Sequence, residues 1–250
     1  MEDQDYATTY RLEDHNWWFV GTRAICLDLL DDALGPPASD APPRILDVGC
    51  GTGLLLERLA DRGRPVGMDV SSLALDFCRR RNGGPLFQAD GARLAVADGS
   101  FDAVTAIGVI EHLERDREAL VEWRRVLRPG GAMVLLTSAY MWMWSGHDVS
   151  NHHTRRYTVG AFRALLEESG LTPLKVSYVN TLLFPGIAAV RLAEKLQRRG
   201  REPEPRKDTG EVPAPLNRAL TGVLDLERRA IARRPLPFGV SIVASARRAD

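Results

Sequence analysis

Short apolar runs alternate with amphipathic stretches along most of this 250-residue chain. The runs that predict buried strands occupy residues 44–48, 65–70, 85–89, 101–109 and 132–138. The stretches with apolar residues three and four positions apart, which is the spacing of a helix, occupy residues 54–62, 73–81 and 116–127. Strands that alternate with helices in this way predict a parallel sheet covered on both faces, and so an α/β fold.

The two flanks of this core read as mainly helical. The N-terminal 37 residues predict a helical lid, whose apolar stretch stops at Gly35-Pro36-Pro37. Beyond the core we expect a helix at 158–169, a strand at 172–178, a helical insertion over 181–234 and a last strand at 240–247. Within the insertion, residues 200–215 are rich in proline and charge, so they predict an exposed, mobile linker. Together these elements predict a single domain over residues 1–250, with its core at 44–180 and a seven-stranded, mostly parallel sheet.

Composition and charge exclude several classes of function. There are 33 basic and 33 acidic residues, so no net field favours nucleic acid as a partner. No apolar run approaches the roughly 18 residues that a membrane span requires. The chain starts with acidic residues where a secretory signal would be basic, and its three cysteines form no C-x-x-C pair. These features favour a cytoplasmic protein without a membrane span.

A glycine-rich turn is the first candidate for chemistry. Gly49, Gly51 and Gly53 lie between a predicted strand and a predicted helix, where the absence of a Cβ lets the backbone approach a ligand closely. The same spacing also suits a tight turn without any ligand. Three acids near the ends of three successive strands favour the ligand, because the carboxyl ends of parallel strands line one crevice; they are Asp47, Asp69 and Asp90.

Residues 45–53 resemble the first motif of the class I S-adenosylmethionine-dependent methyltransferases. The segments 89–91, 100–112 and 126–131 resemble later motifs of that family and follow in the family's order. The G-x-G-x-G spacing also differs from the G-x-G-x-x-G of dehydrogenases. The resemblance implies a Rossmann-like methyltransferase fold, S-adenosylmethionine as cofactor, and an enzyme that methylates a small-molecule acceptor.

The resemblance also implies a role for individual residues. For the methionine moiety it implies Asp47, Gly49, Cys50, Gly51 and Gly53; for the ribose Asp69; for the adenine Val70, Asp90 and Gly91; and for the surroundings of the sulfonium Gly108, Val109 and Glu111. Asp102, at the start of the fourth strand, lies at the far end of the predicted sheet, and we interpret it as structural.

An aromatic segment, His15-Asn16-Trp17-Trp18-Phe19, precedes the first strand. Two adjacent tryptophans on a helix cannot both face the core, so one of them is free to cover a ligand. The segment resembles the lid of small-molecule methyltransferases, which implies Trp18 as a cofactor contact and Arg23 as the partner of the cofactor's carboxylate. The other interpretation is that the aromatic residues only anchor the first helix.

Three of the five histidines lie in one segment after the fifth strand. This segment resembles the H-D-x-x-x-x-H-x-R-R-Y pattern of a subgroup of the family. Four interpretations are open: metal ligation, general base catalysis, orientation of the acceptor, and attachment of the loop. The spacing matches no standard zinc site, so we predict no metal. We predict His147 and His153 as catalytic residues, Asp148 as the group that orients a histidine, and His112 as a further candidate.

The acceptor is left open by the sequence. Natural-product, quinone and sugar-like molecules all fit, with methyl transfer to oxygen, nitrogen or carbon. The insertion carries 12 Lys and Arg against 7 Asp and Glu, which suits either an anionic acceptor or a solvated face. The alternative hypothesis keeps the fold but assigns it another reaction, or a role as the binding subunit of a protein partner. A homo-oligomer is equally compatible with the sequence.

Overall fold

The computed structural model describes residues 3–36, 41–81, 84–198, 200–208 and 210–249. At its centre lies a seven-stranded sheet in the order β3-β2-β1-β4-β5-β7-β6. The strands are β1 (Arg44–Val48), β2 (Arg64–Asp69), β3 (Leu86–Gln88), β4 (Phe101–Ile107), β5 (Leu127–Ser138), β6 (Leu171–Val179) and β7 (Ser241–Arg248). Strands β1 to β5 pair in parallel, and β7 runs antiparallel to both β5 and β6. The predicted seven-stranded, mostly parallel sheet is therefore confirmed.

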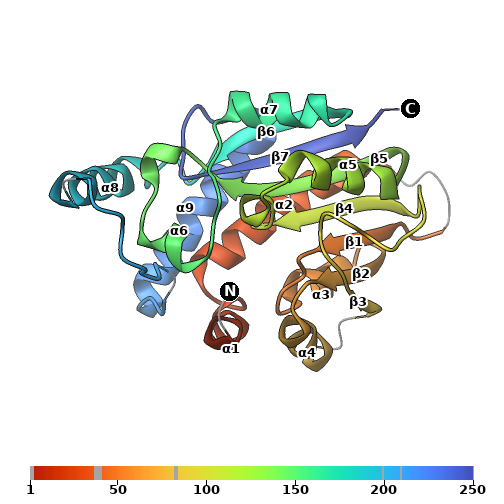
Figure 1. The fold of residues 1–250 in the computed structure, drawn as a ribbon, viewed down its shortest axis with the longest axis horizontal. Coiled ribbons are helices and arrows are strands. Elements are labelled where there is room, and N and C mark those ends of the chain that lie inside the picture. The colour runs from red at the N-terminus through yellow and green to blue at the C-terminus, as the bar shows by residue number, and fades with distance from the viewer. Residues whose placement is uncertain (1–2, 37–40, 82–83, 199, 209, 250) are drawn as a thin grey trace.

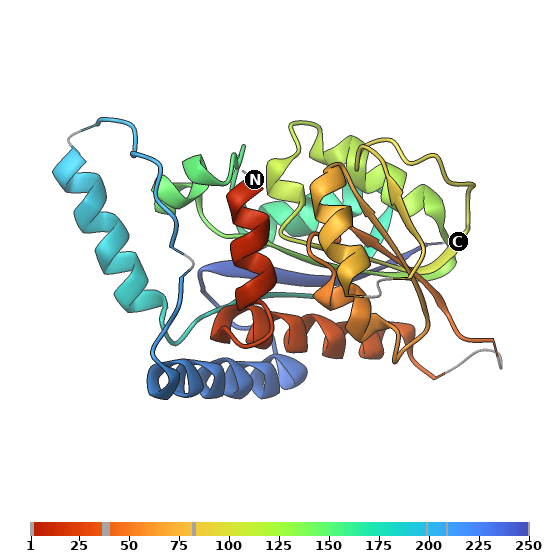
Figure 2. The same ribbon diagram turned by 90° about the horizontal axis from the view of Figure 1, so that it is seen from below.

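Helices cover both faces of the sheet, as Figures 1 and 2 show. Along β5, Met133 and Leu135 join the core cluster that includes α5 (Asp116–Val126) and α7 (Val159–Glu168). The alternate residues Val134 and Leu136 join the cluster that includes α2 (Trp17–Leu34) and α9 (Ala214–Arg233). Because successive side chains of a strand point to opposite faces, this alternation explains why the central strands are apolar throughout.

The remaining short elements lie around the carboxyl edge of the sheet or flank it. They are α1 (Asp3–Leu12), α3 (Leu54–Leu59), α4 (Ser72–Arg80), the 3₁₀ turns η1 (Ile110–His112) and η2 (Met141–Met143), α6 (Gly146–Ser150) and α8 (Phe184–Arg198). Side chains cap two of the helices: Ser71 accepts a hydrogen bond from the Ala74 amide, and Thr158 accepts one from the Ala161 amide. Of the described helices, none is both long enough and apolar enough to cross a membrane.

Most predicted boundaries in the core differ from the structure by at most one residue, and three differ by more. Helix α3 ends at Leu59 instead of residue 62, and β4 ends at Ile107 because Gly108 turns the chain with a φ of +68°. Strand β5 already begins at Leu127, since Leu127 pairs with Phe101 before a register shift. The segment Arg128-Pro129-Gly130-Gly131 therefore lies within β5 and not before it.

The predicted N-terminal lid consists of two helices with different environments. Asn16 separates them and caps α2 by accepting a hydrogen bond from the Trp18 amide, 3.0 Å away. Helix α2 belongs to the layer that covers the sheet, whereas α1 packs against α4, where the rings of Tyr10 and Phe77 lie 5.1 Å apart. The end of the predicted lid at residue 37 lies outside the described residues.

The segment that the sequence predicts as an exposed, mobile linker contacts other elements at several points along its described part. The Arg206 amide donates to the Gly146 carbonyl of α6 at 2.9 Å, and Lys207 forms an ion pair with Asp5 of α1. Residues 200–208 and 210–213 therefore form a strap, shown in Figure 2, that runs from the end of α8 past α6 and α1 to α9.

Candidate cofactor and catalytic site

The glycine loop after β1 has the backbone that only glycine adopts readily. Gly49, Gly51 and Gly53 have φ values of +66°, +54° and +91°. A Cβ on Gly49 would lie 2.5 Å from Cγ2 of Val109, and a Cβ on Gly53 would lie 2.4 Å from Sγ of Cys78. The loop therefore combines a left-handed backbone with close packing. At Gly51 it stays open toward a ligand, because the nearest atom lies 3.9 Å from the place that a Cβ would take.

Asp69 joins the glycine loop to the end of β2. Its carboxylate is 7% exposed and accepts hydrogen bonds from the Gly51 amide at 3.0 Å and the Ser71 amide at 2.9 Å. The predicted ribose-binding acid thus lies directly beside the predicted methionine-binding loop. Next along the chain, the Val70 side chain is 68% exposed and offers an apolar surface at the position predicted for the adenine.

Asp47 is buried at the end of β1 with a single side-chain donor beside it. The Thr105 hydroxyl donates to its Oδ1 at 2.7 Å. Burial raises the pKa of Asp47 to about 7, and the nearby negative charges of Asp69 and Glu13 add to this shift. An acid held in this state would gain from a cationic ligand, because the positive charge would stabilise its ionised form.

Glu13 is a residue of this site that the sequence reasoning missed. The Thr52 hydroxyl of the glycine loop donates to its carboxylate at 2.5 Å, and Nη2 of Arg81 lies 3.1 Å from the same oxygen. Burial raises the pKa of Glu13, and the hydrogen bond from Thr52 and the charge of Arg81 oppose that rise. Glu13 and Thr52 are 39 positions apart, and no spacing rule connects a residue of the N-terminal segment to a glycine loop.

The predicted aromatic lid has mixed surroundings. Nη1 of Arg23 donates to the Glu13 carbonyl at 3.0 Å. Because the Glu13 side chain contacts Thr52 of the glycine loop, Arg23 lies close to that loop. Burial lowers the pKa of Arg23. Trp18 packs against the core cluster that α2 shares with the sheet, and its ring lies edge-on to Trp17 at 5.8 Å. This packing is what the interpretation of Trp18 as an anchor requires.

The remaining predicted cofactor residues follow β1, β3 and β4. Asp90 is exposed and accepts a hydrogen bond from the Ala92 amide at 2.8 Å, while the Gly91 carbonyl accepts one from the Trp123 indole at 2.7 Å. Glu111 is 4% exposed, and the Thr137 hydroxyl donates to it at 3.0 Å. Sγ of Cys50 lies 3.8 Å from Sγ of Cys78; this contact and burial raise the pKa of Cys50, so its thiol stays neutral.

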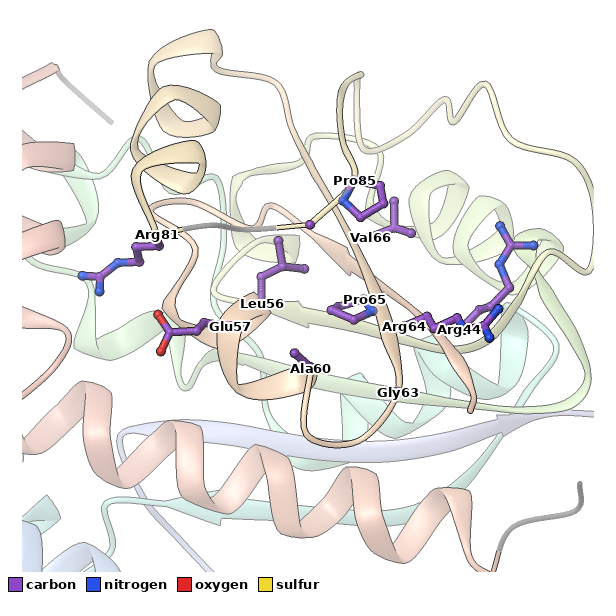
Figure 3. Close-up of a pocket in the computed structure, with 11 residues that line it drawn as sticks. Arg44, Leu56, Glu57, Ala60, Gly63, Arg64, Pro65, Val66, Arg81 and Pro85 are labelled. Atoms are coloured by element: carbon purple, nitrogen blue, oxygen red, sulfur yellow. The ribbon is translucent and has the colours of Figure 1, made fainter. Parts of the chain in front are cut away.

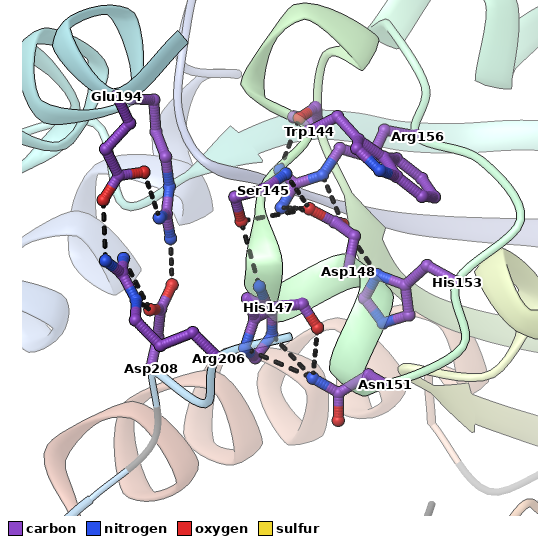
Figure 4. Close-up of polar contacts among 12 residues, drawn as sticks. Trp144, Ser145, His147, Asp148, Asn151, His153, Arg156, Glu194, Arg206 and Asp208 are labelled. Carbon is purple, nitrogen blue, oxygen red and sulfur yellow. Dashed lines mark hydrogen bonds and ion pairs between the residues drawn. The ribbon is translucent and has the colours of Figure 1, made fainter. Parts of the chain in front are cut away.

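A second polar cluster surrounds Asp148, whose side chain is fully buried (Figure 4). Its Oδ1 lies 2.9 Å from Nδ1 of His153, and Arg156 binds both carboxylate oxygens at 2.7 and 3.0 Å. Burial alone would raise the pKa of Asp148, but the hydrogen bonds from His153 and Arg156 bring it well below its usual value. Asp148 therefore has the geometry of a residue that orients a histidine, as the sequence suggested.

The three predicted histidines lie together around His153. The rings of His112 and His153 are 4.7 Å apart between centroids, and those of His147 and His153 are 5.8 Å apart. Burial lowers the pKa of His147 to about 4 and also lowers that of His112, so both stay neutral near pH 7. When Nδ1 of His153 donates to Asp148, its Nε2 carries the free lone pair. Among the residues that the structure describes, no group of three or more His, Cys, Asp or Glu is arranged to hold a metal ion.

A groove of about 850 Å³ lies at the opposite end of the sheet (Figure 3). It is lined by residues from the starts of β1 and β2, including Arg44 and Arg64, and by Leu56 and Ala60 of α3. The predicted ligand residues Asp47 and Asp69 lie at or near the other ends of the same strands. Most of the groove therefore lies away from the candidate site, although Arg81, which contacts Glu13, also lines it.

Asp102 confirms this polarity of the sheet. Its carboxylate accepts a hydrogen bond from the Arg44 amide at 2.6 Å and pairs with Arg128. Both contacts lie where β1 and β4 begin, away from the glycine loop. The interpretation of Asp102 as a structural residue is confirmed.

Replacing Gly49 by alanine is expected to weaken binding of S-adenosylmethionine about tenfold or more. The new Cβ would overlap Val109 and force the loop to shift, a type of overpacking that costs about 1–3 kcal/mol. Gly130→Ala is the matched control, because Gly130 has a φ of +74° but no atom within 4 Å of its Cβ position. Calorimetric titration should show unchanged affinity in the control; equal losses in both variants would refute the packing argument.

Comparison with known proteins agrees with this geometry. A family model described as a methyltransferase domain matches residues 46–135. A ubiquinone biosynthesis O-methyltransferase of Dechloromonas aromatica is 31% identical over 138 residues, which cover 49% of this chain and 58% of that protein. An S-adenosylmethionine-dependent methyltransferase of Mesorhizobium loti shares the fold with a TM-score of 0.55 at 20% identity, over 89% of this chain and 96% of that one.

A second similar structure contains the spent cofactor. It is the geranyl diphosphate C-methyltransferase of Streptomyces coelicolor A3(2) in complex with S-adenosyl-L-homocysteine, with a TM-score of 0.59 at 16% identity over 89% of this chain and 76% of that one. The sheet order, the glycine loop and the acids beside it define an α/β protein built around a nucleoside-type cofactor. Residues 46–135 thus match a methyltransferase domain, and the chain is similar to S-adenosylmethionine-dependent methyltransferases both in this segment and in its fold.

Proposed function

We propose that this chain transfers the methyl group of S-adenosylmethionine to a hydroxyl group of a small-molecule acceptor. The observation that carries this proposal is the contact between His112 and His153, with 4.7 Å between ring centroids. His112 follows β4 on the side predicted for the sulfonium, and His153 belongs to the cluster after β5. The cofactor residues and the candidate base His153 thus adjoin at the carboxyl edge of the sheet.

The residues around the glycine loop fit the proposed cofactor. The open position at Gly51 lets the cofactor approach the backbone closely. Asp47 suits the ammonium group of the cofactor, and Asp69 suits its ribose diol. The exposed side chain of Val70 suits the face of the adenine. Arg23 lies close enough to the loop, through its bond to the Glu13 carbonyl, to serve the carboxylate. When bound, the cofactor supplies an electrophilic methyl group and leaves as a neutral thioether.

The chain's own residues then orient the acceptor and accept its proton. Nε2 of His153 takes the proton of the hydroxyl as its oxygen attacks, and Asp148 stabilises the resulting imidazolium through Nδ1. Asp148 remains ionised because Arg156 and the Ser145 amide also bind it. His147 and His112, neutral and adjacent to His153, are placed to orient the acceptor. The alignment of nucleophile and methyl carbon is the main contribution, because the electrophile is already activated.

The acceptor class that we propose is a phenol or hydroxyquinone. Similarity to an O-methyltransferase of ubiquinone biosynthesis supports this choice, and so do aromatic residues close to the end of β5. There, the rings of Tyr140 and Tyr178 stack at 5.0 Å, and Trp142 lies 5.8 Å from Tyr140. Aromatic faces favour planar acceptors over sugar-like ones.

The proposal is tested by incubating the protein with labelled S-adenosylmethionine and a panel of catechols, hydroxyquinones and sugars. We expect labelled methyl ethers from the first two groups, and at least a hundredfold lower kcat in His153→Gln with unchanged cofactor affinity. Cofactor binding without transfer to any of them would favour the alternative of a methyltransferase fold with another role. A sugar as the best acceptor would refute the aromatic class.

The affinity for S-adenosylmethionine is expected to fall as the pH is lowered from about 8 to about 6. In the ligand-free protein Asp47 has a pKa of about 7, and it must be ionised to hold an ammonium group. Below that pH, binding of the cofactor must therefore remove a proton from Asp47, so the affinity falls up to tenfold per pH unit. The stability of the ligand-free protein is expected to change with pH in the opposite direction to the affinity. Between the unfolded pKa of about 4 and about 7 only the folded state is protonated, so its stability falls as the pH rises.

Calorimetric titrations at several pH values check this dependence. Asp47→Asn should bind more weakly at pH 8 but with little change toward pH 6, whereas Asp102→Asn should keep the dependence of the unmodified protein. An affinity that is flat across this range in the unmodified protein would contradict the assignment of Asp47 as the partner of the ammonium group.

A further inference from the structure

Helix α8 has an unusual relation to the rest of the molecule. In Figures 1 and 2 it stands apart from the sheet, at one end of the molecule. None of its 15 residues is buried. A helix of this length, about 22 Å, normally gains most of its stability by burying one face, so its exposure calls for an explanation.

The two sides of α8 differ sharply in polarity. On one side of the helix, the charged side chains of Arg191, Glu194 and Arg198 are partly buried. Arg191 forms ion pairs with Glu194 of the same helix and with Asp208 of the strap. The opposite side is almost wholly apolar and exposed; it consists of Pro185, Ala189, Val190, Leu192, Ala193 and Leu196. Val190, Leu192 and Leu196 are 55%, 52% and 70% exposed. Apart from Lys195, which is exposed, the charged side chains of the helix are thus turned toward the protein, and most of its apolar residues are turned toward the outside.

Aromatic residues lie at the start of the helix, which Phe184 begins. The Phe184 ring lies 6.2 Å from that of Trp142 and 5.4 Å from that of Phe238. Trp142 and Phe238 remain 41% and 40% exposed. We call these three residues and the apolar side of α8 the α8 surface. Exposed apolar and aromatic residues gathered on one element of a protein surface indicate a partner that covers them.

Positive charge accompanies the α8 surface. Lys195 is exposed between Leu192 and Leu196, and Arg201 is exposed just after the helix. Residues 181–234 carry 12 Lys and Arg against 7 Asp and Glu, although the whole chain has no net charge. An apolar helix face with flanking basic groups and a tryptophan near one end matches the surface of an anionic lipid bilayer, where lysine stems extend along the apolar region and their charges reach the headgroups.

We propose that the α8 surface docks onto anionic lipid membranes, with α8 lying in the plane of the interface. Val190, Leu192 and Leu196 enter the boundary between headgroups and acyl chains, and Trp142 and Phe238 lie at headgroup level. Lys195 and Arg201 contact the anionic headgroups. This inference goes beyond methyl transfer and does not depend on it, because the glycine loop takes no part in the docking.

The test is co-sedimentation of the full chain, without cofactor or acceptor, with vesicles of phosphatidylcholine alone and with added phosphatidylglycerol. We expect binding to the mixed vesicles, weaker binding at high salt, and little binding to pure phosphatidylcholine. Leu192→Gln combined with Leu196→Gln should weaken binding at least tenfold, because the inserted apolar area is lost. Lys195→Glu should weaken binding only to the anionic vesicles.

Matched control variants separate docking from general loss of apolar surface. Leu226→Gln on α9 and Val121→Gln on α5 remove residues that are 60% and 45% exposed elsewhere, and both should bind vesicles normally. Titration with S-adenosylmethionine and the thermal transition verify that every variant is folded. Absence of binding of the unmodified protein to anionic vesicles would overturn the proposal. A dimer in lipid-free solution that the double leucine variant dissociates would overturn it too, since a second copy would then cover the surface.

Discussion

Replacing Asp69 by asparagine is expected to weaken binding of S-adenosylmethionine about a hundredfold. The carboxylate holds the Gly51 and Ser71 amides with its two oxygens, so it shapes the glycine loop as well as meeting the ribose. An asparagine amide would direct its NH₂ group at one of these two amide donors and would lose the charge that strengthens bonds to a diol. The loss of charge-assisted hydrogen bonds costs about 1.5–3 kcal/mol, which corresponds to a factor of about 10 to 150.

The matched control for this prediction is Asp102→Asn. Asp102 is as buried as Asp69, at 8% exposed, and also accepts a backbone hydrogen bond, from Arg44. Because it lies at the far end of the sheet, its replacement should lower the thermal transition without changing cofactor affinity. Calorimetric titration of both variants decides the matter, and wild-type affinity in Asp69→Asn would mean that the ribose lies elsewhere.

Replacing Asp148 by asparagine is expected to lower the free energy of unfolding by about 3–5 kcal/mol. Arg156 is 8% exposed, and without Asp148 its guanidinium would stay buried with no carboxylate beside it. For a chain of this size, a loss of that order lowers the melting temperature by roughly 6–20 °C. Asp225→Asn, which breaks the exposed pairs of Asp225 with Arg228 and Arg229 on α9, should cost at most about 1 kcal/mol.

The pH dependence of this loss has a definite sign. The pKa of Asp148 is lowered in the folded state, so its contribution is fully present above the unfolded value of about 4 and is lost as the pH falls toward the folded value. The gap between the unmodified protein and Asp148→Asn should therefore be constant at neutral pH and shrink below about pH 4. Urea unfolding across this range measures it. If the free energies of unfolding of the unmodified protein and Asp148→Asn differ by less than about 1 kcal/mol at neutral pH, Arg156 finds other partners in the variant.

The candidate site was predictable where its residues are close to one another in the sequence or at repeated places in the fold. Asp47, the glycine loop and Asp69 all follow from one rule, that the carboxyl ends of parallel strands meet at one edge. The pairing of Asp148 with His153 was predictable because only five positions separate them. Glu13 was not, since its contact with Thr52 depends on how α1 and the turn after it pack beside the glycine loop.

The sequence by itself determined the α/β architecture, the polarity of the sheet and the cofactor loop, because periodic apolar residues and glycine spacing act over short distances along the chain. Only the tertiary structure decided which distant segments meet. It attached the strap to α1 and α6 through Lys207 and Arg206, although a proline-rich, charged segment reads as mobile. It also left the apolar side of α8 exposed, since an amphipathic pattern tells that one face differs from the other but not what covers it.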